Sequence, residues 1–189
     1  MKEFIKSIII ILLMFIPIMC SKTFVKYADN FNTNNVKLFQ LRSHYKWLYN
    51  NKLYFAILEN ACKKELEPEL ICAIIEAESN GRNLIGKKNK NGTRDYGFMQ
   101  TNEVHCPENP LKLLEINFGI HKGTNYLMWA YKKAKGNIKI TAQFYNGGLN
   151  HPINTKNKWV KKYANKVVKY YNLSKITTNN KSNYLITTL

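Results

Sequence analysis

Apolar residues recur along much of this chain at the spacing of α-helices, in which side chains three, four and seven positions apart share one face. The pattern covers Leu53 to Cys62 and returns from Leu70 to Ser79, after the polar connection KKELEPE. Pro68 stands where a first helical turn accepts proline, because the N–H group that proline lacks has no partner there. Asn80 and Gly81 follow the second stretch and are typical of a helix end. We therefore predict two helices joined by this connection.

Three more helices are predicted in the second half of the chain. A short one covers Ile138 to Tyr145 and ends at Gly147–Gly148. Gly119 and Gly123 lie on a longer helix and would let another element approach it closely. This helix has apolar or small residues at Ile116, Ile120, Gly123, Leu127, Ala130 and Ala134, and the last helix has them at Val160, Ala164, Val167 and Tyr171.

The segment from Gly81 to Gly97 breaks the helical period, since glycine, lysine and asparagine are its most frequent residues. Its dipeptide Asn91–Gly92 favours tight hairpin turns. The predicted fold class is therefore mainly α, with either one small β-hairpin or a long loop in this segment.

The first 21 residues predict a secretory signal peptide. Two lysines in MKEFIKS precede twelve apolar residues, Ile8 to Met19. As a helix this run would span roughly 18 Å, less than the ~30 Å hydrocarbon core of a membrane. The signal would be cleaved near Cys20 or Ser21, Cys20 would be lipidated, or the segment would remain as an uncleaved anchor. Each alternative predicts an exported protein of the periplasm or cell envelope, with membrane contact only through such an anchor.

Three regions are expected after the signal peptide. Residues 22–50 form an N-terminal extension that is Asn-rich at first and then helical. Residues 51–172 form one compact helical domain, and residues 173–189 form a polar, loose C-terminal tail. The helical part of the extension has four residues on one face, namely Leu38, Leu41, Tyr45 and Leu48.

The formal net charge of +17 would attract the protein to anionic surfaces. All 29 basic residues except Arg42, Arg82 and Arg94 are lysines, and the abundance of asparagine and isoleucine favours an AT-rich coding bias as the origin of this charge. Arginine is the residue that contacts phosphates and bases bidentately, and no nucleic-acid motif is present. We therefore expect no nucleic-acid partner.

Cysteine and histidine show no metal-binding pattern. Once Cys20 is removed or lipidated, Cys62, Cys72 and Cys106 remain and can form at most one disulfide. The chain has neither a CxxC motif nor a Cys/His ligand spacing. We expect no metal and no cofactor.

Glu78 is the strongest candidate for chemistry. It shares the apolar stripe of its predicted helix with Ile71 and Ile75, whereas Glu69 and Glu76 fall outside the stripe and are expected to be solvated. Desolvation raises the pKa of a carboxyl group, and the negative end of the helix acts in the same direction. Glu78 would then stay protonated near neutral pH, as a general acid requires. The alternative is a half-exposed glutamate at a helix end.

Three blocks, ICAIIEAES, DYGFMQ and AQFYNGG, occur in this order. They resemble the soluble-lytic-transglycosylase (SLT) domain of the lysozyme-like superfamily, whose landmarks are Glu-Ser at a helix end, Gly-Leu-Met-Gln and Ala-x-x-Tyr-Asn-x-Gly. The resemblance covers roughly residues 51–172 and implies a lysozyme-like fold. NGTRDYGFMQTNEVHC further resembles the specialised branch associated with secretion and conjugation machines, with Phe98 in place of the usual Leu and Thr101 in place of the usual Ile.

The resemblance also implies an activity. Family members cleave the β-1,4 bond between MurNAc and GlcNAc in peptidoglycan without water and close a 1,6-anhydro ring. Implied partners are peptidoglycan strands and a cell-envelope-spanning secretion, conjugation or flagellar machine. Glu78 would be the catalytic acid/base, with a hydrogen bond from Tyr145. The residues implied to line the glycan groove are Ser79, Met99, Gln100, Tyr145 and Asn146.

Asp95 allows a second interpretation. TRDYGFMQTN is also similar to the strand segment of animal (c-type) lysozymes, in which an Asp at this place is the second carboxylate. A retaining hydrolase needs two carboxyl groups ~5 Å apart. Alternatively, Asp95 braces the loop beside Tyr96–Gly97, as Asp commonly does in turns. The Tyr-Asn-Gly block favours the transglycosylase. The alternatives are a lysozyme-type hydrolase that uses Glu78 and Asp95, and a non-catalytic cell-wall-binding scaffold.

Other polar residues are weaker candidates. His105, His121 and His151 share no ligand spacing, which predicts structural or surface roles. Lys87, Lys88 and Lys90 flank the presumed groove, where they would attract the carboxylates of peptidoglycan peptides.

Overall fold

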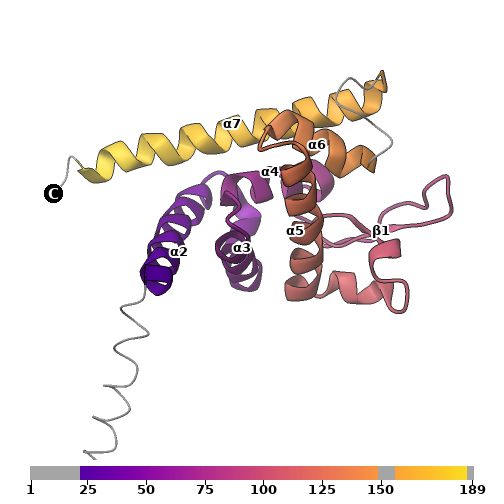
Figure 1. Ribbon diagram of the computed structural model, residues 1–189, viewed down its shortest axis with the longest axis horizontal. Coiled ribbons are helices and arrows are strands. Elements are labelled where there is room, and N and C mark those ends of the chain that lie inside the picture. The colour runs from indigo at the N-terminus through magenta and orange to yellow at the C-terminus, as the bar shows by residue number, and fades with distance from the viewer. Residues whose placement is uncertain (1–21, 149–155, 187–189) are drawn as a thin grey trace, which may run out of the picture.

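The computed structural model describes residues 22–148 and 156–186 and has the mainly α fold class that the sequence predicts (Figure 1). Its α-helices are α2 (Lys22–Leu41), α3 (Asn51–Lys64), α4 (Pro68–Ser79), α5 (Ile116–Lys133), α6 (Ile138–Gly147) and α7 (Lys158–Ile186). The 3-10 helices are η1 (Lys46–Tyr49), η2 (Glu103–His105) and η3 (Pro110–Leu114). Strands β1 (Asp95–Tyr96) and β2 (Thr101–Asn102) form one small antiparallel sheet.

Helix α4 lies at the centre of the fold. Ten of its twelve residues are buried, because α2 and α3 pack against it and α7 crosses over it and over α6 (Figure 1). Pro68 occupies its first turn, as predicted, and Asn80 ends it in the left-handed conformation, with φ 54°. The central position of α4 holds its C-terminal turn, which includes Glu78, between other elements.

The N-terminal extension is helical from its start. The Asn-rich part lies within α2, because its amides find partners: Asn34 donates to Asn30 and to the Cys62 sulfur, and Asn30 donates to the Cys62 carbonyl. The expected order, polar first and helical later, is therefore wrong. The four apolar residues predicted to share a face are all buried, with the last two in and beside η1: Leu38, Leu41, Tyr45 and Leu48.

Residues 173–186 do not form a loose tail, which corrects the prediction for the described part of residues 173–189. Helix α7 continues to Ile186. Ser174 is fully buried, and its hydroxyl lies 2.9 Å from the Tyr45 hydroxyl. Lys175 lies 2.9 Å from Glu67 Oε2. Polar residues are helical here because they meet polar partners on the preceding elements.

Glu69 is fully buried, so the prediction of a solvated acid is wrong. Its Oε1 lies 3.7 Å from Lys37 Nζ on α2 and 3.8 Å from Lys175 Nζ on α7. A buried carboxylate needs compensation of this kind, because an unpaired charge is costly away from water. The three helices α2, α4 and α7 thus meet around one buried charge.

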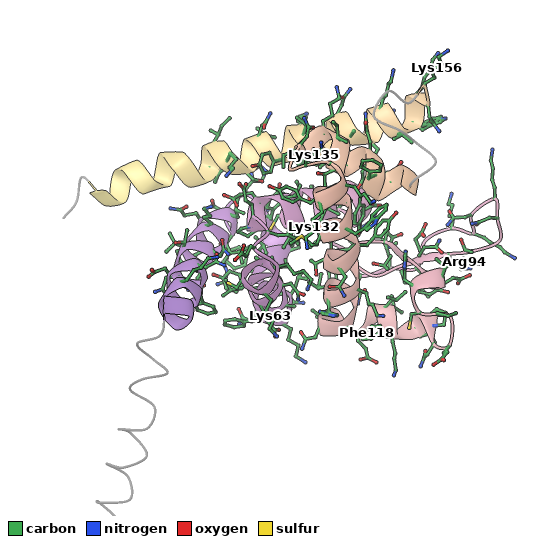
Figure 2. All side chains as sticks on the ribbon, viewed as in Figure 1. Lys63, Arg94, Phe118, Lys132, Lys135 and Lys156 are labelled. Atoms are coloured by element: carbon green, nitrogen blue, oxygen red, sulfur yellow. The ribbon has the colours of Figure 1, made fainter. Side chains whose placement is uncertain are left out.

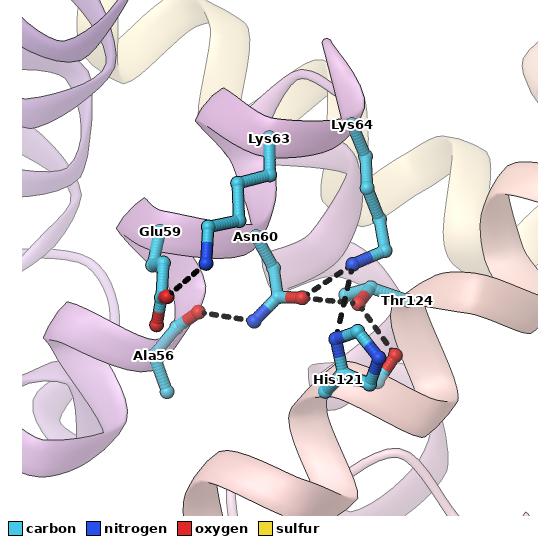
Figure 3. A network of polar contacts seen from close by, with 7 residues as sticks. All are labelled: Ala56, Glu59, Asn60, Lys63, Lys64, His121 and Thr124. Carbon is cyan, nitrogen blue, oxygen red and sulfur yellow. Dashed lines mark hydrogen bonds and ion pairs between the residues drawn. The ribbon is translucent and has the colours of Figure 1, made fainter.

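Helices α3 and α5 are joined by a polar network (Figure 3). The Thr124 hydroxyl on α5 donates to Asn60 Oδ1 on α3 at 3.1 Å. Lys64 donates to the same oxygen and lies 3.5 Å from His121 Nδ1. His121 is exposed at the edge of this network, which agrees with the predicted structural or surface role.

Neither a membrane span nor a metal site is found in the described ranges. No helix within 22–148 and 156–186 is long and apolar enough to cross a membrane. In the same ranges, no group of three or more His, Cys, Asp or Glu side chains is arranged to hold a metal ion. Cys62, Cys72 and Cys106 are free thiols. The predicted signal peptide, Cys20 and His151 lie outside the described residues.

Candidate active site

A cleft of about 360 Å³ opens at the C-terminal end of α4. It contains five of the seven residues that the sequence singled out: Glu78, Asp95, Gln100, Tyr145 and Asn146. The remaining lining residues are Asn89, Thr101, Asn102, His105 and Tyr126. The helix end, the small sheet and the end of α6 thus converge on one site, although they are distant in sequence.

A larger hollow of about 760 Å³ lies elsewhere, and its lining includes parts of α2, α3 and α5. Four lysines and Glu65 line it, and none of the predicted site residues does. We assign the chemistry to the smaller cleft, because it alone of these two brings a general-acid candidate together with the predicted binding residues.

Glu78 is held by a tyrosine of α7. The Tyr163 hydroxyl donates to Glu78 Oε1 at 2.6 Å. The hydroxyl of Tyr145, expected to do this, donates instead to the Met99 carbonyl at 2.9 Å. The prediction of a Tyr145–Glu78 hydrogen bond is therefore wrong. Tyr145 still lines the cleft with Glu78.

Burial raises the pKa of Glu78 from its ordinary value of 4.5 to about 7. The negative charge of Asp95 acts in the same direction, whereas the hydrogen bond from Tyr163 and the positive charge of Lys166 oppose it. Lys166 is fixed nearby by its hydrogen bond to the Ala77 carbonyl, at 2.7 Å. The predicted upward shift and its main cause, desolvation, are both confirmed. A group with this pKa exchanges protons readily near neutral pH.

Asp95 is braced by two side-chain amides. Asn102 donates to Asp95 Oδ1 at 2.7 Å, and Asn89 donates to Oδ2 at 3.0 Å. Asp95 pairs with Asn102 in the register of β1 and β2, and it also lines the cleft. The bracing contact that the sequence suggested is present, and Asp95 lines the same cleft as Glu78.

The segment between Gly81 and Gly97 and the following turn form a small, tightly connected unit. Asn91–Gly92 is part of a turn, in which the Gly92 N–H donates to the Asn89 carbonyl at 2.9 Å. The two strands of the sheet, however, are joined by the next turn, Gly97 to Gln100. Gln100 closes this turn, because its amide donates to the Gly97 carbonyl at 2.7 Å.

Ser79 and Met99 do not line the cleft, which corrects their expected place. Both are buried. The Ser79 hydroxyl donates to the Phe98 carbonyl at 2.7 Å, which ties the end of α4 to the turn carrying Gln100. Met99 packs against Gly123 of α5, where an added Cβ would lie 2.6 Å from its sulfur. These residues support the cleft.

Sequence reasoning missed Tyr163 and Tyr126. Tyr163 lies three positions after Val160 and four before Val167, so it falls on the buried stripe of its helix. A phenol on such a stripe needs a hydrogen-bond partner, and this signal could have identified it. Tyr126 forms one side of the cleft, with its ring 5.1 Å from that of His105. Helical spacing alone does not distinguish such a ring from a core aromatic.

Residues 55–171 match the family described as "Transglycosylase SLT domain". The match covers more than half of the chain, and the chain therefore belongs to this family.

The chain is also similar to the lysozyme of Galleria mellonella, with 48% identity over 40 residues. That similarity covers 21% of this chain and 33% of the lysozyme, so the chain spans about a third of this relative. The comparison with solved structures gives no match.

Proposed function

We propose that this protein is a peptidoglycan lytic transglycosylase in which Glu78 is the general acid and base. The observation that carries the proposal is the place of Glu78, which lines the cleft and accepts a hydrogen bond from Tyr163 at 2.6 Å. Burial, which raises the pKa of Glu78 to about 7, supports it. Membership of the transglycosylase family supports the assignment of the glycan strand as substrate.

The proposed reaction uses one carboxyl group twice. Protonated Glu78 gives its proton to the glycosidic oxygen as the bond from that oxygen to C1 of MurNAc breaks. The 2-acetamido group of the same sugar stabilises the positive charge that develops at C1, as in substrate-assisted glycosidases. The Glu78 carboxylate then takes the proton of the C6 hydroxyl, whose oxygen bonds to C1 and closes the 1,6-anhydro ring. Glu78 ends protonated again, and no water is consumed.

The protein environment suits both steps. Tyr163 engages Oε1, while Oε2 accepts no hydrogen bond from the described residues, which leaves it available for proton transfer. Gln100, Tyr145 and Asn146 lie along the same cleft, and we propose that they bind the sugars on either side of the cleaved bond.

A second candidate is lysozyme-type hydrolysis, in which Asp95 would act as the second carboxylate. The similarity to a lysozyme and the place of Asp95 in the cleft favour it. The two amide contacts hold the Asp95 carboxylate in place. They leave lone pairs free on both oxygens, so the released products and the Asp95→Asn variant decide between a supporting role and a nucleophilic one.

Mass spectrometry of the sugars released from purified peptidoglycan tests the proposal. We expect products ending in 1,6-anhydro-MurNAc, and Glu78→Gln should lose at least about a thousandfold in rate, because it cannot donate a proton. Asp95→Asn should lose less than about tenfold in rate and keep the anhydro product.

Two outcomes would contradict the proposal. Products with reducing-end MurNAc, together with a loss of rate in Asp95→Asn as large as in Glu78→Gln, would indicate a hydrolase. Wall binding that survives Glu78→Gln, with no sugar released by the parent protein, would indicate a scaffold.

We also propose that the protein is exported and acts in the cell envelope, together with a secretion, conjugation or flagellar machine. Two features of the sequence support this: the basic and apolar start of the chain, and the similarity of residues 91–106 to the specialised branch. Cell fractionation of the full-length chain, with N-terminal sequencing of the mature form, tests export. A mature protein that starts at Met1 in the cytoplasmic fraction would contradict it.

A further inference from the structure

The loop that precedes Asp95 is unusually one-sided in charge. Between Glu78 and Asp95 the chain has no acidic residue and five basic ones: Arg82, Lys87, Lys88, Lys90 and Arg94. Lysine is abundant throughout the chain, so charge alone does not single out this loop. Its connection to the cleft does.

Backbone hydrogen bonds hold the loop in a defined shape. The Gly86 N–H donates to the Asp95 carbonyl at 2.7 Å, and the Asn89 N–H donates to the Thr93 carbonyl at 2.7 Å. The Arg94 guanidinium donates to the Gly86 carbonyl at 3.1 Å and thereby joins the two sides. Figure 2 shows Arg94 on this segment, which extends beside β1 away from the helical body. The loop is therefore attached to the strand that carries Asp95.

One residue of the loop belongs to the cleft itself. Asn89 lines the cleft and donates to Asp95 Oδ2. Its neighbours Lys88 and Lys90 are exposed, and their Cα atoms lie about 3.8 Å from that of Asn89. Their ammonium groups therefore stay near Asn89, within the ~10 Å over which charges act in 0.1 M salt. Lys87, Lys88 and Lys90 form no ion pair with any residue in the described ranges.

The charge of the proposed substrate is complementary. The sugars of a peptide-bearing glycan strand are neutral, because the lactyl carboxyl of MurNAc is in amide linkage to the peptide. Its negative charge lies in the free carboxylates of the stem peptides, which project from the strand. A strand lying in the cleft would therefore bring carboxylates past the rim and not to its floor, where Glu78 and Asp95 lie.

We propose that residues 87–94 form a carboxylate-recognition rim, which makes the enzyme select glycan strands whose stem peptides carry free carboxylates. This proposal rests on the proposed function, and it adds the substrate class. The lysines act on binding, since none of them lies among the residues that line the cleft around Glu78. We therefore expect them to lower KM and to leave kcat unchanged.

The test uses two forms of one peptidoglycan preparation, both N-acetylated to block amino groups. In one form the carboxyls are free, and in the other they are converted to methylamides by carbodiimide coupling. The variant is Lys87→Gln/Lys88→Gln/Lys90→Gln. The control is Lys132→Gln/Lys133→Gln/Lys135→Gln at the end of α5, which removes the same charge from exposed positions (Figure 2).

On the free-carboxyl form, the loop variant should raise KM about five- to tenfold with kcat within twofold of the parent, while the control stays within twofold in both. On the methylamide form, the parent and the loop variant should have equal KM. A loop variant with the parent's KM on free carboxyls would overturn the proposal. So would an equal loss on both substrates, or an equal loss in the control.

A binding assay separates this proposal from the proposed function. If the parent protein releases no sugar from either form, the proposed function fails, and co-sedimentation of the Glu78→Gln protein with the two forms still tests the rim. Preferential binding to the free-carboxyl form, lost in the loop triple variant but not in the control, would support the rim. Equal binding to both forms would exclude it.

Discussion

At the scale of single residues, Glu78 shows how a common side chain acquires a special protonation state. Its carboxyl group is partly withdrawn from water at the end of α4, receives one hydrogen bond from Tyr163 and shares a cleft with Asp95. Burial outweighs the favourable contacts, so its pKa rises to about 7. The raised pKa suits a general acid. It must also lower the stability of the folded state at every pH at which the unfolded chain would ionise Glu78.

The sign of this effect follows from proton counts. Between the unfolded value of 4.5 and the folded value of about 7, the folded chain keeps a proton on Glu78 that the unfolded chain has lost. The folded state binds more protons in this range, so the contribution of Glu78 to stability falls as pH rises through it and stays low above pH 7.

Glu78→Gln should therefore stabilise the protein at pH 8 and leave it nearly unchanged at pH 4, because glutamine does not ionise. The expected gain at pH 8 is about 2 kcal/mol, since each pKa unit is worth about 1.4 kcal/mol and partial exposure to the cleft reduces the effect. Urea unfolding at both pH values measures it. An equal change at the two pH values would show that the pKa of Glu78 is not raised.

The sequence allowed some of these residues to be identified but not their partners. Glu78 could be found because its helical position is fixed by Ile71 and Ile75, within one element. The donor to its carboxylate could not, since Tyr163 and Tyr145 stand on different helices and only packing decides which hydroxyl reaches it. Burial of Glu69 was missed for the same reason, because the two lysines beside it come from α2 and α7.

At the scale of elements, helix α5 supports the cleft through two glycines. An added Cβ at Gly119 would lie 2.2 Å from the Leu113 carbonyl oxygen, and one at Gly123 would lie 2.7 Å from the Met99 Cβ. The sequence predicts close approach at both positions, which the structure confirms. It could not identify the partners, η3 and the turn before Gln100, because nothing local in the helix encodes them.

Gly123→Ala should destabilise the protein by about 1–3 kcal/mol, because Met99 must move to admit the methyl group. The proposed cleavage of peptidoglycan should fall as well, since Met99 is adjacent to Gln100 in the cleft. The exposed Lys133→Ala on the same helix is the control and should stay within about 0.5 kcal/mol of the parent. Chemical unfolding and the release of sugars measure the two effects.

A double-mutant cycle with Met99→Ala identifies the cause. If the methyl group meets the methionine side chain, Gly123→Ala should cost less in the Met99→Ala background than in the parent. Costs that add within about 0.5 kcal/mol would exclude the Met99 sulfur and Cγ as the source of the strain and would leave the Met99 Cβ, which alanine keeps.

At the scale of the whole molecule, the fold extends beyond its family domain. The family match ends at residue 171, but α7 continues to Ile186 and α2 begins at Lys22. The two flanks meet through the buried pair Tyr45 and Ser174, whose hydroxyls are 2.9 Å apart. The mainly α architecture and most helix positions followed from periodicity. The helical C-terminal flank did not, because its polar residues resemble a solvated tail until their buried partners are known.

Truncation after Asn172 should therefore lower stability by about 2–3 kcal/mol. It removes the hydrogen bond of Tyr45 and one of the two lysines beside buried Glu69. A chain that ends at Ile186 is the control. Thermal unfolding of both proteins compares them, and equal midpoints would mean that the flank is dispensable.

The positions of α2 and α7 also determine how the molecule would be oriented if one end of the chain were attached to an anchor. In Figure 1, drawn with the longest axis horizontal, α2 and the C-terminal end of α7 lie at one side, and β1 with its loop lies at the other. A linker joined ahead of Lys22 or after Ile186 would therefore pull on the side away from β1. Strand β1, which carries Asp95, would then lie on the side far from the anchor. The reach of the cleft from the anchor would equal the length of the linker plus the width of the molecule.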